Sequence, residues 1–188
     1  DVAVYNESAL GGAAAPKTLE ELAALNKTIG INGYNTESLL SLFYSAGGAV
    51  MKDDFSTAVG YMDSNASVKA LQSLVSLKKL YADFSREGAP SPMAGVASGD
   101  YLMTVANSKA FSNEGVSTDG LTAALVPTAN GAASKSVAGC DAAAILESSA
   151  MKDEAWQFIQ FLAGDEAQAV MAKSGDLPAN DAAARLET

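Results

Sequence analysis

The sequence predicts an α/β fold in which a few short strands form one small mixed sheet flanked by helices. Short apolar runs alternate along the chain with longer stretches whose apolar residues recur every three or four positions. Glycine and proline separate these segments, and 48% of the 188 residues are hydrophobic, which suffices for a core of ordinary size. We therefore expect residues 1–188 to form a single α/β lobe.

One strand and two helices are predicted in the first part of the chain. The strand is a short β-like run, Val2–Asn6. Thr18 can cap the first helix, and Glu21 stands three residues later, which is the spacing of a capping box. Thr36 is expected to cap the second helix, and Gly47 with the glycine after it ends that helix.

The longest helix is expected to begin at Ser64 or Asn65 and to reach about Phe84. Apolar residues at three- and four-residue spacing give it one side that faces the core. This predicted stripe consists of Leu71, Leu74, Leu77, Leu80, Tyr81 and Phe84. A shorter helix, Met93–Ser98, follows and ends at Gly99, because glycine readily adopts the backbone conformation that terminates a helix.

Three further strands are predicted after this point. They are Tyr101–Ala106, Leu121–Val126, which a proline closes, and Ala142–Leu146. A short helix or turn, Ser108–Asn113, lies between the first two. Turn-forming residues separate all of these segments, so the sheet is expected to be small.

The C-terminal part of the sequence predicts consecutive helices. The first covers Asp153–Leu162, and Asp165 is expected to cap the next, with Gln168 at the third helical position. The only tryptophan, Trp156, stands on the first of these helices close to Phe158. Its place among apolar neighbours favours packing in the core over service as a platform for a ligand.

Composition excludes several classes of function. Twelve basic and 22 acidic residues give a net charge of −10, without the clustered lysine and arginine that nucleic-acid binding requires. No apolar run approaches the roughly 20 residues of a membrane-spanning helix. The single cysteine, Cys140, can form neither an intrachain disulfide nor a structural zinc site. We expect no cofactor, no metal ion and no nucleic-acid partner.

The residues also give little support to catalysis. The chain has no histidine, which removes serine–histidine and cysteine–histidine mechanisms, and it has no phosphate-binding glycine motif. Paired carboxylates could still hydrolyse glycosides, and acidic pairs occur at 20–21, 53–54 and 153–154. Each pair has the position of a helix-start or loop acid, which the helix dipole favours. We therefore expect no enzymatic activity.

Four motifs occur in a fixed order along the chain. They are Val4-Tyr5-Asn6 with the helix start PKTLEEL at 16–22, the pair Gly47-Gly48, the strand SGDYLMTV at 98–105, and MKDEAWQFIQFLAGDEAQ at 151–168 followed by GDLPA at 175–179. Together they resemble the second lobe of bacterial extracellular solute-binding proteins that serve ABC importers, of the maltose-binding-protein type. The similarity extends over most of the chain.

This resemblance implies a two-lobed protein that closes on a small solute about a hinge. The present chain would be the second lobe, without the first lobe and without the final helices. The intact protein would be exported, either to the periplasm or to the cell surface, where a lipid anchor could hold it. Its partners would be a solute, most often a carbohydrate, and the permease subunits of an ABC importer.

The resemblance also implies three places for solute contacts, of which the first precedes the second helix. It contains Tyr34, Asn35 and Glu37. An aromatic ring, an amide and a carboxylate suit a polyol, because rings cover C–H surfaces while the polar groups bond hydroxyls. The same residues could also form an ordinary turn with a helix cap.

The other two places follow the predicted strand at 101–106 and precede the one at 142–146. The first has Asn107, Lys109 and Phe111, where the family often has a tryptophan that stacks on sugar. The second has Cys140 and Asp141, where a close backbone approach to the solute is expected. A surface position for Lys109, a buried one for Cys140 and a turn-capping one for Asp141 stay open as alternatives.

Two other interpretations follow from the same residues. An ammonium at Lys109 in place of an aromatic ring would allow an anionic solute, such as a uronic acid, on the same fold. A stand-alone interaction domain, docking through its acidic surface on a transporter or a cell-surface protein, is the remaining interpretation.

Overall fold

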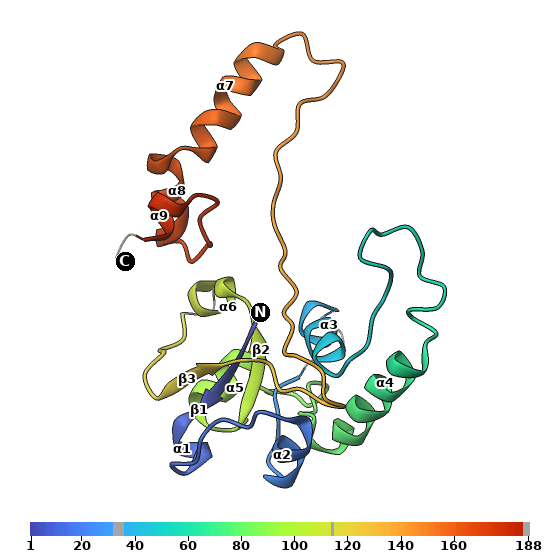
Figure 1. Cartoon of the computed structure of the whole chain (residues 1–188). Helices are drawn as coiled ribbons and strands as arrows, with labels where there is room; N and C mark the ends of the chain where they lie inside the picture. Colours follow the sequence, from blue (N-terminus) through green and yellow to red (C-terminus); the bar gives the residue numbers. More distant parts are fainter. Residues whose placement is uncertain (32–35, 114, 186–188) are drawn as a thin grey trace. The chain divides into compact units, whose positions relative to one another are not determined.

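The structure is a computed structural model that describes residues 1–31, 36–113 and 115–185. The chain divides into two compact units, whose elements are labelled in Figure 1. The first unit comprises Asp1–Asn107 and Glu114–Ala138, and the second comprises Ser108–Asn113 and Gly139–Thr188. Because the second unit takes a short segment from the middle of the sequence, the chain passes between the units at 107/108, 113/114 and 138/139.

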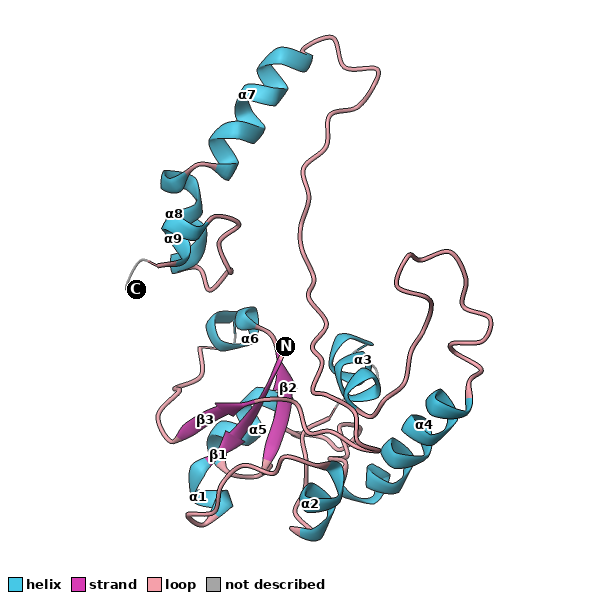
Figure 2. Ribbon diagram, in the orientation of Figure 1, coloured by secondary structure: helices cyan, strands magenta, loops and turns pink. Residues whose placement is uncertain are grey.

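An antiparallel sheet of three strands in the order β2-β1-β3 forms the centre of the first unit (Figure 2). The strands are β1 Val2–Asn6, β2 Met103–Ala106 and β3 Leu121–Ala124. Val4 of the central strand pairs with Thr104 on one side and with Ala123 on the other. The α/β fold class is confirmed, but the described sheet is antiparallel and not mixed as predicted. In addition, β2 begins two residues later and β3 ends two residues earlier than predicted.

Helices surround this sheet, and their side chains complete the core of the first unit. Their bounds are α1 Glu7–Leu10, α2 Leu19–Ala24, α3 Thr36–Ser45, α4 Asn65–Leu77 with a 3-10 turn Lys78–Leu80, and α5 Pro92–Ser98. Helix α5 packs against β1 and β2, while α3 packs against β2 and α4. Ala3 and Tyr5 of β1 join Leu22, Leu42 and Leu77 in one buried cluster.

Two predicted helix ends of the first unit, the start of α2 and the end of α3, are confirmed, whereas Thr36 is the first residue of α3 and not its cap. The Thr18 hydroxyl accepts a 3.1 Å hydrogen bond from the Glu21 amide, and the Glu21 carboxylate bonds the Thr18 amide in return. Gly47 has a φ of +90° and ends α3, with its amide and that of Gly48 bonded to carbonyls of the last helical turn. Such left-handed C-caps favour glycine, because a Cβ atom is unfavourable there.

The predicted stripe of the longest helix is wrong in part. Leu74 and Leu77 are buried, but Leu71 is 44% exposed, and α4 ends at Leu77. The buried side continues instead through Ser67 and Ala70, both 0% exposed. At Ser67 the backbone of two preceding segments of the same chain lies within hydrogen-bonding distance of the helix. The Ser67 hydroxyl donates a 2.7 Å hydrogen bond to the Tyr61 carbonyl and a 3.1 Å hydrogen bond to the Ala49 carbonyl.

Two serines of α3 hold the segment at 135–137 against that helix. The Ser45 hydroxyl donates 2.8 Å to the Lys135 carbonyl and accepts a 2.8 Å bond from the Lys135 amide. One turn earlier, the Ser41 hydroxyl accepts a 2.9 Å bond from the Val137 amide. The serine hydroxyls thereby bond backbone groups of this segment that a neighbouring strand would bond in a sheet.

The second unit consists of helices and an extended segment. Its helices are α6 Ser108–Asn113, α7 Lys152–Ala163, α8 Asp165–Lys173 and α9 Asp181–Ala184, with α8 packed against both α7 and α9. The strand predicted at Ala142–Leu146 is wrong, because this stretch is irregular and mostly exposed. Within the described part of this unit there is no strand with which it could pair.

Two predictions about the C-terminal helices are also wrong. Trp156 is 54% exposed, since no described residue of α7 is buried and α8 covers only part of that helix. Asp165 is the first residue of α8, so Gly164 occupies the capping position without a side-chain bond. The Asp165 carboxylate still lies in the first turn, where the helix dipole favours negative charge. None of the helices that the structure describes is long and apolar enough to cross a membrane.

Candidate functional site

The structure describes six of the eight predicted contact residues. Tyr34 and Asn35 lie outside the described residues. The first unit holds Glu37 and Asn107, and the second holds Lys109, Phe111, Cys140 and Asp141. Each unit therefore has its own group of candidate contacts.

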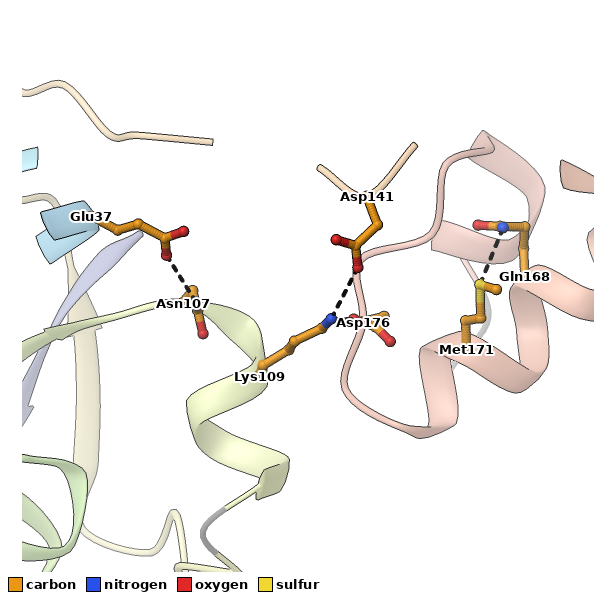
Figure 3. Close-up of polar contacts among 7 residues, drawn as sticks. All are labelled: Glu37, Asn107, Lys109, Asp141, Gln168, Met171 and Asp176. Carbon is orange, nitrogen blue, oxygen red and sulfur yellow. Dashed lines mark hydrogen bonds and ion pairs between the residues drawn. The ribbon is translucent and has the colours of Figure 1, made fainter. Parts of the chain in front are cut away.

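Glu37 and Asn107 come together at the end of β2. The Asn107 side-chain amide donates a 3.4 Å hydrogen bond to a Glu37 carboxylate oxygen (Figure 3). Next to Glu37, the buried Ser38 hydroxyl donates 2.8 Å to the Val105 carbonyl, which fixes the start of α3 against β2. The pair leaves an amide and a carboxylate exposed side by side, which is a suitable arrangement for bonding hydroxyl groups.

Lys109 of α6 lies between two carboxylates of the second unit. Its ammonium is 3.0 Å from an Asp176 oxygen and 3.4 Å from an Asp141 oxygen (Figure 3). The hydrogen bond and charge of Asp176, followed by those of Asp141, raise the pKa of Lys109 above its ordinary value. The lysine thus stays protonated, and the three side chains together carry one net negative charge.

Asp176 is the contact residue that sequence reasoning missed. It follows Gly175, which has a φ of +86° and ends α8. A glycine at a helix end followed by an acid was the available signal, but nothing in the sequence relates position 176 to position 109. Its side chain is 35% exposed, compared with 98% for that of Asp141.

The loop that carries Asp176 is held by two amide side chains. Gln168, only 6% exposed, donates 2.7 Å to the Leu162 carbonyl and accepts a 2.6 Å bond from the Ala179 amide. The Asn180 side chain donates 3.1 Å to the Ala163 carbonyl. The loop is therefore bonded to the end of α7 directly through Asn180 and indirectly through Gln168 of α8.

Phe111 and Cys140 have less defined roles. Phe111 is half-buried on α6, and Cys140 is exposed beside Asp141. Because residues 142–146 are not a strand, Cys140 and Asp141 stand in an extended segment and not at a strand entry. The exposed thiol also excludes the alternative in which Cys140 is a buried small residue.

Taken together, the contacts suit hydrogen bonding better than metal chemistry. Across the described ranges, no three histidine, cysteine or acidic side chains come close enough to hold a metal ion. Carboxylates accept hydrogen bonds from hydroxyls, while the ammonium and the Asn107 amide donate them. Charge-assisted bonds of this kind are about twice as strong as neutral ones.

Comparison with known protein families relates the chain to one of them. The family model described as bacterial extracellular solute-binding protein matches residues 1–188, so it covers both units. No match was found among curated proteins.

Proposed function

This chain belongs to the bacterial extracellular solute-binding proteins, and from that premise we propose that it captures a neutral, polyhydroxylated solute, most simply a carbohydrate. The family implies an exported protein at the cell surface or in the periplasm, which binds a small solute for an ABC importer. Its members generally bind their solutes without transforming them.

The observation that carries the choice of solute is the pairing of Lys109 with two carboxylates. An anionic solute such as a uronic acid would have to approach a cluster with a net negative charge, in which Asp176 and Asp141 already compensate the ammonium. A neutral polyol would meet acceptors and a donor that match its hydroxyls without bringing a charge of its own. The pairing therefore supports the neutral solute over the anion.

The remaining predicted contacts complete this proposal. Glu37 and Asn107 provide a carboxylate–amide pair for hydroxyl groups. Tyr34 and Phe111 are proposed to cover C–H surfaces of the solute. Asn35 is proposed to bond hydroxyls, and Cys140 to allow a close approach of the backbone.

The proposal includes the two-lobe mechanism that the resemblance implies. In the intact protein the solute would be enclosed between this lobe and a second one, and a lipid anchor could hold the protein at the membrane. Closure of two lobes excludes water and adds contacts from both sides. The chain of 188 residues would then supply part of the contacts and bind a solute weakly.

Nitrogen-15 NMR of the full chain tests the proposal, since chemical shifts report even millimolar binding. The chain would be titrated with maltose and other neutral di- and trisaccharides, and in parallel with disaccharides that carry a uronate. We expect the neutral sugars to shift the amides of Glu37, Lys109 and Asp141. Shifts with the uronates alone would favour the anion, and no shifts with either set would favour the interaction domain.

A further inference from the structure

We propose that Asp176 is a positioning residue of the solute site, which holds the Lys109 ammonium so that Lys109 and Asp141 meet solute hydroxyls in a fixed geometry. The inference rests on the proposed function, because only that function makes Lys109 a solute contact. It adds a residue to the site and gives the residues different roles. Asp176 holds the Lys109 ammonium in place, whereas Asp141 and Lys109 bind the solute.

The contrast between the two carboxylates supports this division. Asp176 lies closer to the ammonium, at 3.0 Å against 3.4 Å, and its side chain is 35% exposed. The Asp141 side chain is 98% exposed and stands on an extended segment. A fixed and partly covered acid is suited to orienting the lysine, while an acid in open solvent can exchange water for solute hydroxyls.

The backbone around Asp176 is held more firmly than an ordinary surface loop. On its N-terminal side, the Asp176 amide bonds the Met171 carbonyl at 3.2 Å as part of the helix end. On its C-terminal side, the Ala179 amide is bonded by the buried Gln168, whose other end is fixed to Leu162. An acid held from both sides can fix a flexible lysine at little further cost in entropy.

An ordinary surface ion pair is the alternative, and the chain contains one for comparison. Lys52 and Asp54 form an exposed pair two residues apart, with both side chains about half exposed, at 49% and 53%. Such pairs contribute little to stability. The Lys109–Asp176 pair differs because it joins α6 to a distant segment of the chain.

The first part of the test needs no solute. Lysine side-chain NMR would give the pKa of Lys109 in the full chain and in Asp176→Asn, Asp141→Asn and Asp54→Asn. Since a nearby carboxylate stabilises the ammonium, we expect the pKa to fall most in Asp176→Asn, to fall less in Asp141→Asn and to stay unchanged in Asp54→Asn. An unchanged pKa in Asp176→Asn would overturn the positioning role.

The second part measures binding of the neutral sugar that shifts the wild-type amides most. We expect Asp176→Asn to weaken it about threefold, the size of one exposed ion pair, and Asp176→Glu to restore most of the loss. Asp141→Asn should weaken it as a direct contact, and Asp54→Asn should not change it. Unchanged affinity in Asp176→Asn despite a lowered Lys109 pKa would also overturn the positioning role.

The two proposals fail in different ways. If no neutral sugar shifts the wild-type chain, the proposed function is wrong, and the role of Asp176 in binding falls with it. If sugars bind but Asp176→Asn leaves both the Lys109 pKa and the affinity unchanged, only the positioning role is wrong. Amide spectra of each variant show that it is folded before either measurement is interpreted.

Discussion

The side-chain oxygen of Gln168 accepts a 2.6 Å hydrogen bond from the backbone amide of Ala179, and this bond ties the loop after α8 to the body of the second unit. Replacing Gln168 by alanine would leave that amide and the Leu162 carbonyl without their present partner. We expect a loss of about 0.5–1.5 kcal/mol in unfolding free energy for each of these hydrogen bonds, because both are only partly buried. Denaturant unfolding and faster hydrogen exchange at the Ala179 amide would measure it.

The matched control for this change is Gln157→Ala on the exposed surface of α7. It removes the same side chain where water can replace every hydrogen bond, so exchange at Ala179 should stay as in the wild type. Equal effects of the two substitutions would contradict the role given to Gln168.

Ser45→Ala tests the attachment of the segment at 135–137. The Ser45 hydroxyl is fully buried and serves both polar backbone groups of Lys135. Its removal should destabilise the first unit by about 1–3 kcal/mol and speed hydrogen exchange at the Lys135 amide. Ser76→Ala, which removes an exposed hydroxyl bonded only within α4, is the control and should leave that exchange rate unchanged.

Tyr5 gives a prediction for alkaline pH. Burial raises the pKa of its phenol well above the ordinary value of 10.0, and none of the described residues bonds its buried hydroxyl. Above pH 10 the unfolded chain loses this proton while the folded chain keeps it, so stability should fall as pH rises. Tyr5→Phe should reduce that fall, and at pH 8 it should stabilise the chain by about 1 kcal/mol by removing an unsatisfied hydroxyl.

Urea unfolding of wild type and Tyr5→Phe at pH 8 and pH 11 would measure both effects. Burial also raises the pKa of Tyr81, so the variant should still lose part of its stability at alkaline pH. A variant that loses as much stability as the wild type between the two pH values would show that Tyr5 ionises normally in the folded chain.

Trp156 provides a direct spectroscopic check of α7. Because the residue is 54% exposed, its emission should lie close to that of the unfolded chain, and acrylamide should quench it efficiently. The unfolded chain in urea is the reference for both quantities. A strongly blue-shifted and protected tryptophan would instead support the core position that its apolar neighbours suggested.

Features set by neighbouring residues were predictable from the sequence. The capping box of Thr18 and Glu21 and the glycine end of α3 depend on groups within one helical turn, and both are confirmed. Strand β1 was predictable because a short apolar run is itself a local signal in the sequence. Such runs are typical of strands that are buried on both faces, as β1 is.

Features that depend on distant partners were not predictable in the same way. Leu71 and Ala70 are adjacent, and only the packing around α4 decides that the smaller residue faces the core. In the candidate site, Lys109 and Asp141 were both expected, but their common partner Asp176 was missed. Helical and strand periodicity report which side of one element is apolar, not which element covers it.

The second unit is built from two separate segments of the sequence, so its parts are made at different times during synthesis on the ribosome. The first unit draws its residues from positions 1–138, and its core is complete once Val126 and Ala129 have emerged. Helix α6 is made before then, yet its lysine must wait for Asp141 and Asp176. Since domains fold as units during synthesis, a nascent chain halted before position 139 should expose a folded first unit carrying an unfinished α6.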